Sequence, residues 1–136
     1  MKKILVIVLL LSTLKVQAAI LIYGVINPNP TVRDFEGYNI IEEVFMSALF
    51  EQNIVSFNER DGRANFYLEN ALYSARLMGT SLVIVWQLNA HVLSGALYTA
   101  DGAKLAEITT EAANPSPHNL TLAANQAINY LINNLP

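Results

Sequence analysis

The spacing of hydrophobic and polar residues changes several times along the chain. Residues 20–26 form an apolar run rich in β-branched residues, which predicts a strand, and the breaker Asn-Pro-Asn-Pro follows at 27–30. From Glu36 to Gln52, apolar residues recur every three or four positions, which predicts an amphipathic helix with Asp34 near its positive end. Residues 54–57 then predict a short strand.

The middle of the chain repeats this alternation. Residues 58–63 form a polar loop, after which Asn65 could cap a second helix that ends at Met78. Gly79 stands where a left-handed residue commonly terminates a helix. Residues 81–88 are the most hydrophobic stretch after the amino-terminal segment, and they predict a central strand buried on both faces.

The last third of the chain predicts a hairpin and a helix. Strand patterns at 92–99 and 104–110 flank Asp101-Gly102, a strong signal for a tight turn. A helical pattern follows at 119–135. The element order is therefore βαβαβββα, which predicts an α/β (α+β) two-layer sandwich with a mixed five-stranded sheet and three helices. We expect the first three strands to be parallel, joined by right-handed crossovers, and the last three to form an antiparallel meander.

The first eighteen residues have the three parts of a secretory signal. Lys2 and Lys3 precede an apolar run at 4–11, and small residues lead to Ala18. We expect cleavage after Ala18, release into the periplasm, and a single soluble domain at 19–136. The alternative, a membrane anchor, needs roughly 20 apolar residues, and Lys15 interrupts the run well before that length. No cysteine is present to carry a lipid, and no second apolar stretch is long enough to span a bilayer, so we expect no membrane insertion after cleavage.

Removal of residues 1–18 changes the charge balance. Five basic and eleven acidic residues then remain, a net charge near −6, which argues against nucleic acid or anionic lipid as a partner. The charged fraction is also low for a globular domain, and a weakly charged surface is a poor barrier to association. A partner could cover part of this surface, or the composition could reflect an AT-rich genome. Without cysteine, packing alone must hold the fold.

The sequence contains little that resembles catalytic chemistry. It has no cysteine and no Gly-x-Ser-x-Gly motif, and its two imidazoles, His91 and His118, have no partner at metal-ligand spacing. A site built from both with Glu111 is the remaining alternative. Glu42 and Glu43 are adjacent on the first helix, where we expect a solvated face. We therefore expect no catalytic residue, no metal and no cofactor.

Two groups of residues are candidates for binding. Arg60, Asp61 and Arg63 lie in the predicted polar loop, where they could hold an anionic group or form local ion pairs. Phe66, Tyr67 and Tyr73 belong to the second helix but fall outside its expected inner face, which is formed by Leu68, Ala71, Leu72 and Ala75. Aromatic side chains outside a core are common anchors of protein interfaces. The alternative is a helix packed on two sides.

Two segments resemble motifs of a known group. They are Gly79-Thr80-Ser81-Leu82-Val83-Ile84-Val85 and the hairpin Leu97-Tyr98-Thr99-Ala100-Asp101-Gly102-Ala103-Lys104. With the element order, they make residues 20–135 similar to the TolB amino-terminal domain and its relatives LpoB, CsgG and FlgT. That resemblance implies a non-enzymatic domain that contacts other envelope proteins.

These observations lead to one expected function and two alternatives. We expect an exported, periplasmic, non-enzymatic accessory or assembly protein that binds a component of a cell-envelope machine, such as a pilus, a flagellum, a secretion system or the wall-synthesis apparatus. Its partner would be an envelope protein or a second copy of the chain. The first alternative is a soluble periplasmic binder of a small ligand or glycan, and the second is a hydrolase.

Overall fold

A computed structural model describes residues 19–136, and the predicted signal peptide lies outside these residues. The order of elements is βαβαβββα, which confirms the predicted order and the predicted numbers of strands and helices. Within the described chain, no helix is both long enough and apolar enough to cross a membrane. The elements are β1 Ile20–Val25, α2 Val32–Glu51, β2 Ser56–Asp61, α3 Leu68–Leu77, β3 Leu82–Asn89, β4 Val92–Thr99, β5 Lys104–Glu111 and α4 Pro117–Asn133.

The five strands form one mixed sheet in the order β2-β1-β3-β4-β5. β1 pairs in parallel with both β2 and β3, so that Ile20 lies beside Ser56 and Leu82. β3, β4 and β5 are antiparallel neighbours, and the turn between the last two uses Gly102 with a φ of 100°. The predicted parallel half, antiparallel meander and central position of β3 are all confirmed.

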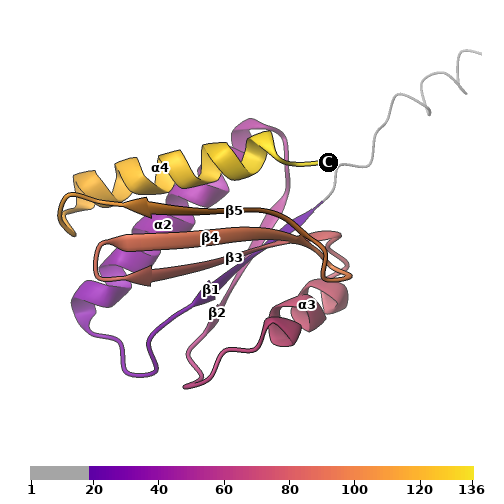
Figure 1. Cartoon of the computed structure of the whole chain (residues 1–136), viewed down its shortest axis with the longest axis horizontal. Coiled ribbons are helices and arrows are strands. Elements are labelled where there is room, and N and C mark those ends of the chain that lie inside the picture. Colours follow the sequence, from indigo (N-terminus) through magenta and orange to yellow (C-terminus); the bar gives the residue numbers. More distant parts are fainter. Residues whose placement is uncertain (1–18) are drawn as a thin grey trace, which may run out of the picture.

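The strand order places the helices on both sides of the sheet. The chain steps from β1 to β2 in one direction and then returns across β1 to β3, so two right-handed crossovers must use opposite faces. α2 and α4 accordingly pack along one face, which we call the closed face, and α3 lies on the other (Figure 1). The predicted sandwich thus has α2 and α4 as its main helical layer, and α3 adds a partial layer opposite.

The closed face holds the larger core. Trp86 of β3 is fully buried there beside Tyr38 of α2, with ring centroids 5.9 Å apart. The indole lies directly over Gly24 of β1, where a Cβ atom would come within 2.5 Å of the ring. α2 and α4 complete this core with buried residues that include Phe45 and Ile128. A glycine in the middle of β1 is therefore required by the packing of the tryptophan.

The α3 side holds a smaller core. Leu21, Tyr23 and Val25 of β1 and Val83 of β3 pack against α3, whose buried residues are Ala71, Leu72 and Ala75. This confirms three of the four residues predicted for the inner face of the helix, and Leu68 is half-buried. Gly79, with a φ of 71°, follows the helix as its predicted terminator.

Two boundaries that concern the candidate binding residues differ from the prediction. Arg60 and Asp61 belong to β2 rather than to a loop, because the parallel pairing with β1 continues to Val25 opposite Asp61. An edge strand can carry such polar residues because one side of it faces solvent. Phe66 and Tyr67 precede α3 rather than begin it, since the helix starts at Leu68 without a side-chain cap from Asn65 or any other residue.

Candidate functional site

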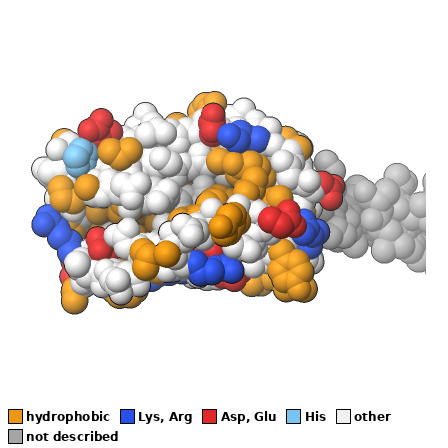
Figure 2. Space-filling model, turned by 60° about the horizontal axis from the view of Figure 1, so that its bottom comes forward, with side chains coloured by type: hydrophobic (Ala, Val, Ile, Leu, Met, Phe, Trp, Pro, Cys, Tyr) orange, Lys and Arg blue, Asp and Glu red, His pale blue; other side chains and the backbone are white. Residues whose placement is uncertain are grey.

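The side of the sheet that carries α3 is only partly covered. α3 packs over β1 and β3. On the same side of the sheet, side chains of β4 and β5 are solvent-accessible. Ser94, Glu107 and Thr109 are exposed, and Ala96 and Tyr98 are half-buried. We call these five residues the open sheet face. Figure 2 turns this side toward the viewer and shows hydrophobic side chains in several patches with charged ones between them.

A shallow hollow of about 400 Å³ lies where the open sheet face meets the segment before α3. Phe66 and Val85 line it together with Tyr98. The Nζ atom of Lys104 lies 5.8 Å from the centroid of the Tyr98 ring and 2.8 Å from a carboxylate oxygen of Glu107. The hollow therefore combines apolar and aromatic walls with hydrogen-bonding groups, the mixture typical of binding sites.

The three predicted partner-binding aromatic residues occupy different positions. Phe66 packs against Tyr23, with ring centroids 6.2 Å apart, and contributes to the hollow. Tyr67 and Tyr73 point away from the core, with exposed fractions of 64% and 56%. Leu77, at the end of the same helix, is 70% exposed. We call Tyr67, Tyr73 and Leu77 the α3 patch. Because all three side chains are more than half exposed, this patch is accessible to a partner.

The three predicted polar residues do not form one site. Successive side chains of a strand point to opposite faces, so Arg60 lies on the closed face and Asp61 lies on the α3 side. Arg63 follows the strand and turns back onto Asp61. The group that the sequence placed together is therefore divided between the two faces of the sheet.

Asp61 is the centre of a buried cluster on the α3 side. The Tyr23 hydroxyl donates a hydrogen bond of 2.6 Å to Asp61 Oδ2. Arg63 donates from Nε to Oδ1 and from Nη2 to Oδ2, both at 2.8 Å. These hydrogen bonds, led by those from Arg63, lower the pKa of Asp61 to about 2. Burial, together with the hydrogen bond to Asp61, raises the pKa of Tyr23 to about 12.

Arg60 forms a second cluster beneath α2. Its Nε and Nη2 donate to the two carboxylate oxygens of Glu42 at 3.0 and 2.7 Å, and Nη2 also reaches Asn39. The guanidinium carbon lies 5.8 Å from the ring centroid of Tyr38. Glu42 is only 6% exposed, so the expectation that it lies on a solvated face is wrong. Its burial is possible because Arg60 satisfies both oxygens.

These two clusters explain what the polar residues do. The carboxylates of Glu42 and Asp61 already take up both guanidinium groups in bidentate pairs. An incoming anion would meet guanidinium groups whose Nε and Nη2 donors already bind a buried carboxylate. The arrangement therefore fixes the end of β2 against α2 on one face and against β1 on the other.

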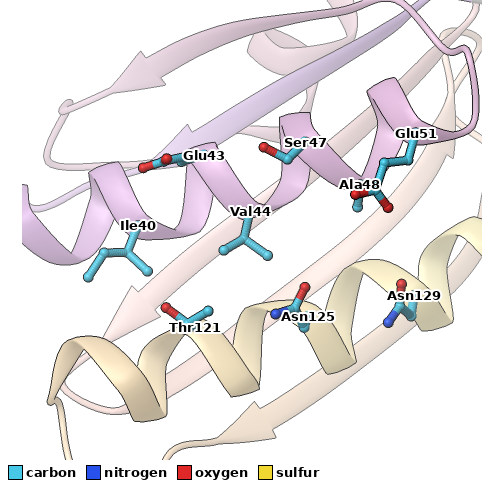
Figure 3. Close-up of a pocket in the computed structure, with 9 residues that line it drawn as sticks. All are labelled: Ile40, Glu43, Val44, Ser47, Ala48, Glu51, Thr121, Asn125 and Asn129. Atoms are coloured by element: carbon cyan, nitrogen blue, oxygen red, sulfur yellow. The ribbon is translucent and has the colours of Figure 1, made fainter.

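A groove of about 410 Å³ runs between α2 and α4 on the closed face. Ile40 and Val44 point from α2 toward α4, and Thr121 and Asn125 point back toward α2 (Figure 3). The carboxylates that line the groove, Glu43 and Glu51, are two turns apart, roughly 12 Å along the helix axis. That separation exceeds the roughly 5–10 Å at which two carboxylates act on one glycosidic bond.

The two histidines lie at exposed or half-exposed sites. His91 Nε2 is 3.0 Å from Glu111 Oε1, an interaction between β5 and the turn before β4. His118 is exposed in the first turn of α4. Among residues 19–136, no three His, Cys, Asp or Glu side chains are grouped as a metal site requires.

Comparisons with known proteins add little to this description. No family model matches the chain, and no curated protein matches it. A solved structure titled glycerol dehydratase reactivase is similar with a TM-score of 0.46 and 16% sequence identity, over 88% of this chain and 95% of that one. Similarity at this level assigns neither a family nor a function.

Proposed function

We propose that this chain is an exported periplasmic accessory protein that binds another component of a cell-envelope assembly without covalent chemistry. One observation carries the proposal: the α3 patch exposes two tyrosines and a leucine on the same side of the molecule as the open sheet face. Tyrosine is enriched among the residues that contribute most of the binding energy of protein interfaces. The resemblance to the TolB group is a further reason for choosing an envelope partner.

The distribution of charge also supports binding over catalysis. Arg60, Arg63, Arg76 and Lys104 each lie within 2.8 Å of a carboxylate oxygen in an ion pair. These pairs hold four of the five basic side chains of residues 19–136. Among the groups with a shifted pKa, Asp61 and Tyr23 satisfy each other at the α3-side core. A structural pair of this kind accounts for the shifts without a reaction.

Export is the part of the proposal that rests on residues 1–18. The first strand begins at Ile20, so cleavage after Ala18 would remove no residue of any described strand or helix. Mass spectrometry of the protein from a periplasmic extract tests this directly. A chain that begins at Ala19 supports export, and a chain that keeps residues 1–18 in the cytoplasm contradicts it.

Partner binding is tested in the native host. Envelopes are cross-linked, and the tagged chain is purified under denaturing conditions. We expect a reproducible adduct with one envelope protein, formed when a photo-activatable residue replaces Tyr73 and absent when it replaces Gln126 on α4. Recovery of only the uncrosslinked chain, or equal cross-linking from both positions, would contradict the proposal.

A second candidate function is the binding of a small ligand or glycan in the hollow. Phe66 and Tyr98 offer ring faces there, and Ser94, Glu107 and Thr109 add hydrogen-bonding groups. Thermal unfolding in the presence of soluble wall glycans separates the two candidates, because a ligand that binds only the folded state raises the melting temperature. A rise that Tyr98→Ala abolishes would favour this function, and an unchanged melting temperature favours the protein partner.

A further inference from the structure

β2 is the outermost strand on one side of the described sheet, and its backbone groups can be assigned to sides. The Ile20 N–H donates to the Val55 carbonyl at 3.0 Å, and the Ile26 N–H donates to the Asp61 carbonyl at 2.9 Å. The N–H and C=O groups of successive residues in a strand point to opposite sides. The backbone groups of residues 55, 57, 59 and 61 therefore form hydrogen bonds with β1. Ser56, Asn58 and Arg60 therefore direct their N–H and C=O groups away from the sheet.

This edge has little of the protection that outer strands usually carry. Phe57 and Val55 are 43% and 57% exposed, where natural edges tend to place charges. Glu59, Arg60 and Asp61 supply charge toward the end of the strand, but Arg60 and Asp61 are held in ion pairs and Glu59 accepts a hydrogen bond from the Ser74 hydroxyl. A mainly apolar hollow of about 800 Å³, lined in part by Phe50 of α2, adjoins the start of the strand.

We propose that β2 pairs antiparallel with β2 of a second copy, about a two-fold axis through Asn58. Directly opposite residues of an antiparallel pair lie on the same face of the sheet. The two-fold axis must therefore pass midway between the two copies of one residue, which lie opposite each other. An axis at Glu59 or Arg60 would place identical charges opposite each other, which is unfavourable. An axis at Asp61 is unfavourable for the same reason, so three positions of β2 remain: Ser56, Phe57 and Asn58.

Hydrogen bonding selects Asn58. An axis there pairs Asn58 with its equivalent, and it pairs Ser56 with Arg60 of the second copy, so all three outward-facing residues are used. An axis at Phe57 would pair Arg60 with residue 54, and an axis at Ser56 would pair Asn58 with residue 54. The N–H of that residue already donates to the Leu49 carbonyl at 3.0 Å. An axis at Asn58 therefore gives hydrogen-bond partners to more of the outward-facing backbone groups of β2.

The same register decides which side chains meet. On the α3 side, Phe57 lies opposite Glu59 of the second copy and diagonal to its Phe57, a distance that aromatic rings can span. The result is a continuous ten-stranded sheet in which both α3 patches face the same way. This isologous arrangement does not depend on the proposed envelope partner, although it would present that partner with two equivalent sites.

Single cysteines test the pairing, because the natural chain has none. In the proposed dimer the two copies of residue 58 form a hydrogen-bonded pair with Cα atoms about 5.5 Å apart, which suits a disulfide. Under mild oxidation we expect Asn58→Cys to form a covalent dimer and Thr109→Cys, exposed on β5, to remain monomeric. Equal cross-linking of both variants, or none of Asn58→Cys, would overturn the proposal.

Charge at residue 57 tests the register. In sedimentation equilibrium of the purified protein, we expect a reversible dimer. Phe57→Glu places a carboxylate opposite Glu59 of the second copy, and Phe57→Lys places an ammonium group there. Each contact occurs twice by symmetry, so we expect the dimer of the Glu variant to be roughly tenfold weaker than that of the Lys variant. A monomeric wild-type protein, or equal affinities for the two variants, would refute the pairing. Circular dichroism checks that both variants fold.

Discussion

The two faces of the sheet differ in how completely helices cover them. The closed face lies under two long helices, and its core includes the largest buried side chains, Trp86, Tyr38 and Phe45. The opposite face lies under α3 alone, a helix of ten residues, and keeps polar and aromatic side chains at its surface. The difference indicates a division of roles: the closed face supplies most of the stability, and the α3 side is available for binding.

Matched leucine truncations should show the largest difference between the faces. Leu97 is fully buried in the closed core, and Leu72 is 5% exposed in the α3-side core. We expect Leu97→Ala to lower the free energy of unfolding by about 4 kcal/mol and Leu72→Ala by about 2–3 kcal/mol, since α3 can shift to fill part of the cavity. Urea denaturation measures both. Equal losses would contradict the proposed division of stability.

The Asp61 cluster should make the α3 side sensitive to acid. The folded-state pKa of Asp61 is about 2, below the ordinary value near 4, so its contribution is present above pH 4 and lost as the pH falls toward 2. We expect Asp61→Asn to lower the free energy of unfolding at pH 7 by about 2 kcal/mol. The difference between variant and wild type should shrink at pH 2–3. If the difference in unfolding free energy between wild type and variant does not change with pH, the ionised Asp61 carboxylate is not the source of the lost stability.

Removal of the Tyr23 hydroxyl should have a smaller effect. Tyr23→Phe deletes the 2.6 Å hydrogen bond and leaves Asp61 with Arg63, so we expect a loss of about 1 kcal/mol. Since burial and Asp61 raise the pKa of Tyr23 to about 12, its hydroxyl stabilises the fold below pH 10, and this contribution is lost as the pH rises toward 12. Tyr73→Phe, on the exposed side of α3, is the control. It should change neither the free energy of unfolding nor the dependence of that free energy on pH between 10 and 12.

Much of this fold could be predicted from local patterns. The hairpin at Asp101-Gly102 and the terminator Gly79 were identifiable because each depends on a residue that tolerates positive φ. The three amphipathic helices and the hydrophobic central strand β3 were identifiable from their periodicity. The uneven covering of the two faces follows from the strand order, and that order depends on contacts between distant segments that local spacing does not contain.

The residues of the two polar clusters illustrate what could not be predicted from the sequence. The second half of β2 reads as a loop because Glu59, Arg60 and Asp61 are consecutive charges. Its strand conformation is fixed by β1, more than thirty residues earlier. Glu42 has the helical position of a solvated residue and is buried because Arg60 reaches it from β2. One signal was present: Tyr23, a hydroxyl-bearing residue in an otherwise apolar strand, needs a buried partner.

The most direct measurement compares two pairs of exposed hydrophobic residues on opposite sides of the molecule. Tyr67→Ser with Tyr73→Ser alters the α3 patch, and Leu122→Ser with Tyr130→Ser alters α4, where the two side chains are 55% and 43% exposed. We expect each pair to change stability by no more than about 1 kcal/mol. Capture of the envelope partner should fall at least roughly tenfold for the α3 pair and stay unchanged for the α4 pair. Undiminished capture by the α3 pair would contradict the assignment of binding to this side.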